Sequence, residues 1–238
     1  MIANEVINAL KSVASDERRK TNEWFFKTGK GQYGYGDQFI GVRMPDLRKV
    51  AKQYHQYISF DNISKLLKST IHEVRLCGLI ILVYQFPKGN QDKIYEFYSA
   101  NFASINNWDL VDSSAPNIVG NYLLDKPDRA EILQNYAHSK NLWIRRISIV
   151  STLAFIRQNQ FQQTIEIGKI LLSDSHDLIH KAVGWMLREV YKRDQNLIKS
   201  FLKQNYAQLP RTTLRYAIER MDKQERQSFL KGRFDVSN

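Results

Sequence analysis

Apolar residues recur three or four positions apart along almost the whole chain after Pro45. The spacing is clearest at Ile144, Ile147, Val150, Ala154 and Phe155. Such a period is typical of helices that bury one face. No run of alternating apolar and polar residues bounded by hairpin turns is found, so strands are not predicted. The pattern therefore predicts an all-α protein.

Helix boundaries can be predicted from prolines, glycines and capping residues. Pro45 suits the first turn of a helix that continues to Tyr54. Breaks are predicted at Pro87-Lys88-Gly89-Asn90, Asp125-Lys126-Pro127 and Leu209-Pro210. The candidate N-terminal caps of later helices are Asp61, Asp128, Ser139 and Ser175. Helices of this length with short connections are typical of helical repeat proteins.

Five positions share one sequence pattern and lie 37, 34, 35 and 34 residues apart: Arg75, Asp112, Arg146, Lys181 and Arg215. The second residue after each is usually small, and the third is small or apolar. A fixed period of this size indicates a repeat array, in which equivalent positions line up along one surface. We therefore expect an α-solenoid, a superhelix of HEAT-like repeats, with a concave basic groove in which one carboxylate interrupts a row of cations.

One continuous domain over residues 1–238 is predicted, because contacts in such arrays run between neighbouring repeats. Residues 46–238 would form the repeats. Residues 1–45 would form a helical segment followed by a loop rich in glycine and aromatic residues. Residues 29–34 of this loop match the letters G-x-G-x-x-G, but the segment before them reads as helix and not as the strand that a dinucleotide site requires. We expect a loop that packs on the repeats or touches a ligand.

The excess of basic residues points to a polyanionic partner. Lys and Arg number 35 and Asp and Glu 24, so the net charge is 35 − 24 = +11. Nucleic acid, an acidic membrane surface and an acidic protein all remain possible partners. The longest apolar run, Leu76 to Tyr84, is far shorter than the ~20 residues that span a bilayer, and no leader is evident. The single cysteine, Cys77, favours the reducing cytosol and a place in the core.

Metal and nucleophile chemistry are not favoured. His176 and His180 would share a helix face, but a zinc site normally has at least three protein ligands. We expect these two residues to be solvated or to cap a helix. No serine or cysteine has an evident neighbouring base. The sequence therefore predicts neither a metal nor another cofactor.

Asp112 has the most informative surroundings of any acid in the chain. Trp108 precedes it by one helical turn, and Pro116 follows it by four residues. The proline would remove the hydrogen bond to the carbonyl of Asp112 and kink the helix there. Trp185 lies one turn after Lys181. A structural role is one interpretation of these residues: Asp112 would form an ion pair with Arg146 or Arg75, and both tryptophans would pack in the core. Alternatively, the carboxylate could stabilise an oxocarbenium-like sugar while the indoles hold a cationic nucleotide.

Several motifs together resemble the AlkD-like DNA alkylation-repair glycosylases, a family of HEAT-like solenoids. They are the segments 25–37, 41–48, 107–112, 143–146 and 181–189. The resemblance implies that Asp112 is the catalytic aspartate and that Trp108 and Trp185 flank the lesion sugar. It also implies that Arg146 binds the DNA backbone. Further DNA contacts are expected from Arg43, Arg75, Arg145, Lys181 and Arg215.

The resemblance implies hydrolysis of the N-glycosidic bond of N3- or N7-alkylated purines in duplex DNA, while the base stays stacked. Its cellular place would be the cytoplasm, at the nucleoid when DNA is bound, and nothing suggests more than a monomer. Two other hypotheses stay open. One is a non-catalytic module that binds distorted or branched nucleic acid, and the other is a helical scaffold for an acidic protein.

Overall fold

The computed structural model describes residues 2–234, and among them helices are the only repeating secondary structure. One isolated bridge joins Gln38 to Ile71. The all-α prediction is confirmed. The chain divides into two compact units, Met1–Ile118 and Val119–Asn238. The prediction of a single continuous domain with one concave groove stays a prediction.

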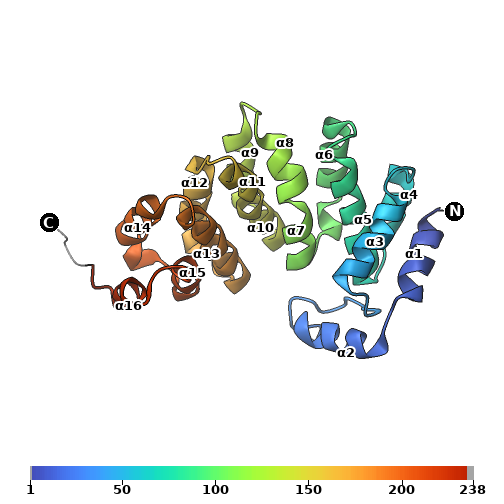
Figure 1. The fold of residues 1–238 in the computed structure, drawn as a ribbon, viewed down its shortest axis with the longest axis horizontal. Helices are drawn as coiled ribbons and strands as arrows, with labels where there is room; N and C mark the ends of the chain where they lie inside the picture. The colour runs from blue at the N-terminus through green and yellow to red at the C-terminus, as the bar shows by residue number, and fades with distance from the viewer. Residues whose placement is uncertain (1, 235–238) are drawn as a thin grey trace. The chain divides into compact units, whose positions relative to one another are not determined.

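The first unit is built around α5, His72–Gln85, whose residues from His72 to Leu82 are all buried. Helices α1, α3, α4 and α7 all pack against α5 (Figure 1). A helix that is buried on every side is typical of the centre of a packed unit. The other helices of this unit are α1 Ile2–Ser12, α2 Asp16–Phe25, α3 Met44–Tyr54, α4 Phe60–Leu67, α6 Gln91–Ala100, the 3-10 turn Phe102–Ser104 and α7 Trp108–Ser114.

The second unit consists of two layers of helices. Helix α10 packs on α13 and α13 packs on α15, while α9, α12 and α14 lie on one side of this row (Figure 1). The helices are α8 Asn121–Leu123, α9 Arg129–Ala137, α10 Leu142–Ser151, α11 Leu153–Arg157, α12 Gln162–Ile170, α13 Asp177–Tyr191, α14 Gln195–Gln204, α15 Arg211–Ala217 and α16 Lys223–Lys231. Short 3-10 turns occupy Leu171–Ser173 and Tyr206–Gln208.

The 35-residue period corresponds to equivalent helices. Asp112, Arg146, Lys181 and Arg215 are each the fifth residue of their helix, in α7, α10, α13 and α15. Arg75 is the fourth residue of α5. The predicted helical repeat is therefore confirmed, and each repeat contributes one helix that carries the charged position.

The helices begin close to the predicted positions, but several of the capping residues differ from those predicted. Pro45 lies in the first turn of α3, as predicted. Asp128 is the residue before α9, but its side chain makes no capping hydrogen bond. The caps of α4, α10 and α13 are corrected from Asp61, Ser139 and Ser175 to Ser59, Asn141 and His176. In α10 and α13 the true cap lies nearer the helix and accepts its hydrogen bond directly.

Pro116 interrupts the helical ladder after Asp112. Helix α7 ends at Ser114, and residues Pro116–Gly120 form a turn of π-helix. Proline has no N–H to donate to the carbonyl of Asp112, so the α-helical pattern cannot continue through it. The helical hydrogen-bonding pattern thus changes at this proline, and the kink at Asp112 stays a prediction.

The long apolar run of the sequence lies inside the first unit. Residues 76–84 belong to α5, and Cys77 is buried there, which confirms its predicted place in the core. Burial raises the pKa of the Cys77 thiol to about 12, so it stays protonated and unreactive at neutral pH. Within residues 2–234, no helix is long and apolar enough to cross a membrane.

Candidate functional site

A loop outside the repeats, residues 26–43, covers the start of α5. The buried carboxylate of Glu73 accepts hydrogen bonds from the backbone N–H groups of Ile40, Gly41 and Val42, at 3.1, 2.8 and 3.3 Å. Gly41 has a φ of +80°, and a Cβ there would lie 2.0 Å from the carbonyl oxygen of Ser15. Only glycine fits this position. The loop is therefore fastened to the helix at its C-terminal end.

Aromatic stacking fastens the other end of the loop. The ring of Phe26 stacks on that of Trp108, with centroids 5.2 Å apart, and on that of Phe39, at 5.1 Å. Phe39 in turn stacks on His72 at 4.6 Å. Of the two roles expected for this loop, packing on the helices is confirmed.

A buried network of charges joins the loop to α5 and α7. His72 lies between two carboxylates, with its Nε2 2.7 Å from Asp109 and its Nδ1 3.1 Å from Asp37. The guanidinium of Arg75 donates to Asp37 at 2.6 Å. Asn107 also donates to Asp37, at 3.2 Å. Two carboxylates thus face one imidazole and one guanidinium.

Protonation of His72 completes the charge balance. Burial alone would lower the pKa of His72, but Asp109 and Asp37 outweigh it and raise that pKa to about 9. Burial would likewise raise the pKa of Asp37, yet the hydrogen bond from His72 and the charge of Arg75 hold it below its usual value. At neutral pH the network therefore contains an imidazolium between carboxylates.

The start of α7 is held by this network. The amide oxygen of Asn107 accepts from the N–H of Trp108 at 2.8 Å and so caps the helix. The indole N–H of Trp108 donates to the hydroxyl of Tyr33, on the loop, at 3.2 Å. Asp112 lies one turn further along, and residues four apart share a helix face. Trp108 and Asp112 are both half-buried. An indole and a carboxylate are thus presented together on a fixed helix.

The sequence predicts Arg75 in a row of cations along one surface, but the residue lies inside the first unit. Its side chain is buried, and besides Asp37 it donates to the backbone oxygen of Ser69 at 2.8 Å and to Asn106 at 3.1 Å. The loop that carries Asp37 covers this part of α5, and the sequence pattern of the repeats contains no sign of that cover. In this structure Arg75 therefore supports the site from within the protein, and its expected contact with DNA stays a prediction.

The neighbouring arginines of α10 are also engaged within the second unit. Arg146 is 5% exposed and donates to the carbonyl oxygen of Leu178. Its expected contact with the DNA backbone stays a prediction. Arg145 forms an ion pair with Asp174 at 2.6 Å and donates to Ser139. Both guanidiniums brace α10 against the segment that starts α13.

The remaining predicted site residues are accessible. Lys181 is 38% exposed in its side chain and pairs with Asp177, one turn earlier in α13, at 2.8 Å. This contact and a hydrogen bond from Thr212 lower the pKa of Asp177. Trp185 is half-buried one turn after Lys181. Arg215 in the second unit and Arg43 in the first are exposed.

The two histidines of α13 have structural roles. The Nδ1 of His176 accepts from the N–H of Leu178 and caps the helix, as one of the expected alternatives. The ring of His180 contacts the backbone oxygen of Asp174. In residues 2–234, no three His, Cys, Asp or Glu side chains come together in a way that could hold a metal ion.

Sequence reasoning missed the residues that support the site, above all Asp37, His72 and Asp109. A signal for two of them was present. His72 and Asp109 are 37 residues apart, the same spacing as Arg75 and Asp112, and each precedes its anchor by three residues. Polar residues at a repeated position where a core residue belongs indicate a buried pair. Asp37 lies outside the repeats, and no period could have found it.

The comparison with curated proteins gave no match. A structure described as a predicted DNA alkylation repair enzyme from Enterococcus faecalis has a TM-score of 0.72 and 17% sequence identity, over 88% of this chain and 97% of that one. This likeness establishes the fold. The family described as DNA alkylation repair enzyme matches residues 6–221, which include all of the predicted site residues. With nearly its whole length matched, the chain belongs to the DNA alkylation repair enzyme family.

Proposed function

We propose that this member of a DNA alkylation repair family is a DNA glycosylase that hydrolyses the N-glycosidic bond of purines alkylated at N3 or N7. One observation carries the proposal. Asp112 and Trp108 share a face of α7, and the start of that helix is held by stacking, by Tyr33 and by buried charges. A carboxylate and an aromatic ring in fixed positions suit a reaction in which positive charge moves from a base to a sugar.

The chemistry needs little acid assistance. An N3- or N7-alkylated purine already carries a positive charge, so it takes the electron pair of the C1′–N bond and leaves as a neutral base. Positive charge then develops on the sugar, as an oxocarbenium-like species. The carboxylate of Asp112 would stabilise it. At ~4 Å and an effective dielectric constant of about 20, such a pair contributes ~4 kcal/mol, which is roughly a thousandfold in rate.

Water completes the reaction. Its oxygen forms the new bond to C1′, and one of its protons is lost as the bond forms. The same carboxylate can orient this water and accept the proton. The products are a neutral alkylated base and an abasic site in the duplex. In this scheme the base does not have to enter a pocket, so we propose excision without base flipping.

The remaining site residues would bind DNA. Trp108 offers an aromatic face to the cationic nucleotide. Trp185, in the second unit, offers an aromatic face to DNA. Lys181, Arg215 and Arg43 are exposed and suit phosphate contacts, which position a duplex without reading its sequence. Arg146 and Arg145 are held by intramolecular partners. We propose that they act as fixed charges near the backbone of the DNA and not as flexible side chains that close on it.

Base release from methylated duplex DNA tests the proposal. The Asp112→Asn variant keeps the shape of the side chain but loses its charge, so release should fall about a thousandfold while most DNA binding remains. Freed bases would be measured by chromatography. Asp125→Asn is the matched control, because it removes the same charge from an exposed turn between α8 and α9. Its release should equal that of the parent.

Two outcomes would count against the proposal in different ways. Equal release by Asp112→Asn and the parent would remove this carboxylate from the mechanism. Tight binding of the parent to DNA with no release from any methylated duplex would favour the alternative of a non-catalytic module for distorted or branched nucleic acid.

A further inference from the structure

Three exposed aromatic side chains stand at the end of α2 and on the following loop. Trp24 is 82% exposed, Phe25 53% and Tyr35 65%. Full exposure of an indole is unusual, because burying it would release a large apolar area from water. A cluster of exposed apolar side chains often marks a site of interaction, whereas a single exposed one is common.

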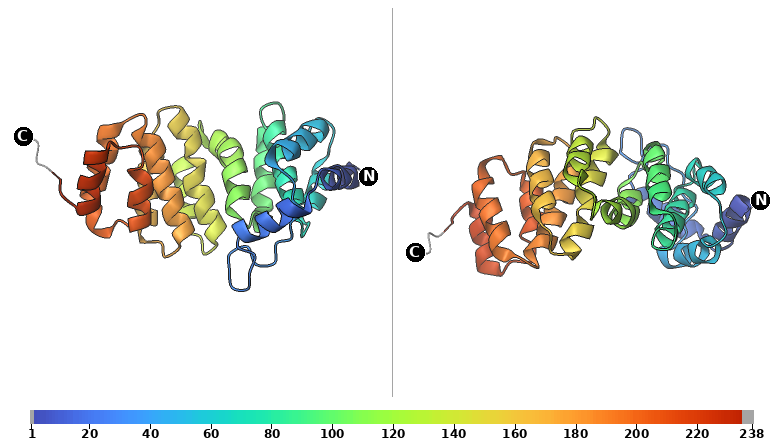
Figure 2. Two further views of the ribbon diagram at one scale, coloured as in Figure 1. Left: turned by 60° about the horizontal axis from the view of Figure 1, so that its bottom comes forward. Right: turned by 90° about the horizontal axis from the view of Figure 1, so that it is seen from above.

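A hollow of about 640 Å³ lies beside Trp24. Its walls come from the last turn of α2 and from the loop: Lys20, Glu23, Trp24, Phe25, Lys27, Thr28, Gly29 and Gln32. Figure 2 shows the dark blue loop that follows α2 projecting away from the helices of its unit. The volume is within the range of pockets that hold a small molecule or one nucleotide.

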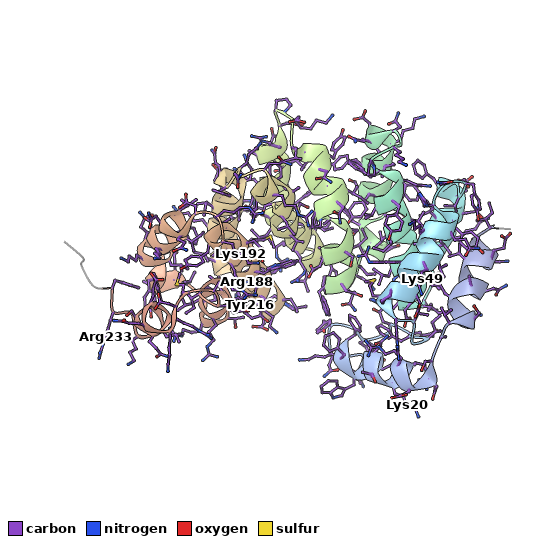
Figure 3. All side chains as sticks on the ribbon, viewed as in Figure 1. Lys20, Lys49, Arg188, Lys192, Tyr216 and Arg233 are labelled. Carbon is purple, nitrogen blue, oxygen red and sulfur yellow. The ribbon has the colours of Figure 1, made fainter. Side chains whose placement is uncertain are left out.

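The charge around the hollow is positive. Lys20 and Lys27 are both exposed, and Figure 3 shows Lys20 at the outer edge of α2. The acid of the lining, Glu23, already forms an ion pair with Arg19 at 2.7 Å. Lys20 has only a loose contact with Asp16, at 3.5 Å between two well-exposed side chains. An anionic ligand with a flat aromatic part would complement this surface.

The backbone of the loop fixes the place of Lys27. This residue has a φ of +53°, a left-handed conformation that non-glycine residues adopt rarely. Its N–H donates to the carbonyl oxygen of Trp24 at 3.3 Å, and its own oxygen accepts from Gly34 at 3.2 Å. A strained residue held from both sides is often found at a binding site.

The hollow is close to the proposed active site. Phe25, the residue after Trp24, meets Trp108 edge to face, with centroids 5.8 Å apart. Phe25 also lines the hollow, so the hollow lies next to the helix that carries Trp108 and Asp112.

We propose that Trp24, Lys20 and Lys27 form a second DNA subsite that binds one unpaired nucleotide near the lesion. The indole stacks on the base, and the two ammonium groups contact its flanking phosphates. This inference rests on the proposed function, since it places the subsite beside the helix that carries Asp112. Its consequence is that the protein prefers duplexes with an unpaired base over fully paired ones.

The test compares fluorescein-labelled duplexes with and without a single unpaired thymidine, together with an oligothymidylate single strand. Fluorescence anisotropy would give the affinity of the full-length protein for each. The Trp24→Ala variant should lose about tenfold or more in affinity for the unpaired and single-stranded probes, and much less for the paired duplex. Trp24→Phe should restore most of the loss, because a phenyl ring still stacks.

Matched controls separate stacking from general changes at the surface. Tyr57→Ala removes another exposed aromatic ring of the same unit, away from the hollow, and should leave all three affinities unchanged. The double variant Lys20→Gln, Lys27→Gln should weaken all three probes and reduce the dependence of binding on salt by about two phosphate contacts.

Clear results would overturn the subsite. Equal affinities of Trp24→Ala and the parent for the single strand would do so. Binding of the parent to vesicles of anionic lipid that is lost in Trp24→Ala, with DNA binding unchanged, would assign the aromatic cluster to a membrane surface. Failure of the proposed glycosylase is a separate result, because it is read from base release by Asp112→Asn and not from these affinities.

Discussion

The starts of α7 and α13 occupy the same place in the repeat but are held by different forces. Each helix carries a charged residue at its fifth position and a tryptophan one turn away from it. In α7, buried charges and stacked rings from a loop outside the repeats fix the helix. In α13, the charged residue pairs within its own helix at the surface, and the helix is positioned by close packing against α15.

The close packing of α13 depends on a glycine. A Cβ at Gly184 would lie 2.5 Å from the Cβ of Tyr216 and 2.6 Å from the carbonyl oxygen of Thr213. Arg188 of α13 also forms an ion pair with Glu219, two residues after the end of α15, and Figure 3 labels Arg188 and Tyr216 on this part of the second unit. The helix that we propose to carry the reacting carboxylate is thus held by desolvated charges, whereas the helix that we propose to contact a phosphate is held by backbone proximity.

The largest effect in this comparison is expected from His72. Its folded-state pKa of about 9 lies above the ordinary 6.5, so its contribution to stability is complete below pH 6.5 and is lost as the pH rises through about 9. That shift corresponds to about 3 kcal/mol. The free energy of unfolding of the parent should therefore exceed that of His72→Gln by about this amount at pH 6. The difference between the two free energies should become smaller by pH 10.

Urea unfolding of the two proteins between pH 6 and 10 measures this difference directly. Titration of lysines and tyrosines affects both proteins alike and cancels. Asp37 behaves in the opposite sense: its lowered pKa contributes stability at pH values above its ordinary 3.8, and this contribution is lost as the pH falls through the lowered value. A difference in free energy of unfolding between the parent and His72→Gln that stays constant with pH would mean that His72 is not charged in the folded protein.

Gly184→Ala should have a smaller effect, located in the second unit. The added methyl overpacks the contact between α13 and α15 and should lower the free energy of unfolding by about 1–3 kcal/mol. Gly168→Ala in α12 is the control, because its Cβ would meet only a methyl group of Val183 at 3.8 Å. That variant should be neutral or up to about 1 kcal/mol more stable. Equal effects of the two changes would show that close approach does not hold α13.

The smallest effect on stability is expected for Lys181→Gln. Its ion pair with Asp177 is exposed, and pairs of this kind contribute less than about 0.5 kcal/mol. Binding should respond more clearly, with the slope of log affinity against log salt reduced by about one phosphate contact. A thermal melt and a salt titration of DNA binding would measure both. A large loss of stability with an unchanged slope would mean that Lys181 supports the fold and does not contact DNA.

Much of the architecture could be predicted because it depends on local spacing. The 35-residue period located the equivalent helices, since a repeated contact surface demands the same residue types at the same phase. The same reasoning assigned Arg75 to an exposed surface and was wrong, because the cover over α5 comes from residues 26–43. Because this loop is not part of a repeat, its contact with α5 produces no periodic pattern in the sequence.

From the sequence alone, three properties of this protein followed: an all-α repeat fold, a strongly basic composition, and the pairing of Asp112 with Trp108 one turn apart on α7. These are consequences of helical periodicity and of charge, which are local or additive. Only the tertiary structure decided that His72 binds two carboxylates, that Arg75 is buried and that Trp24 is exposed. Burial depends on which distant segment covers a surface, and desolvation then determines whether a charged side chain supports the fold or faces DNA.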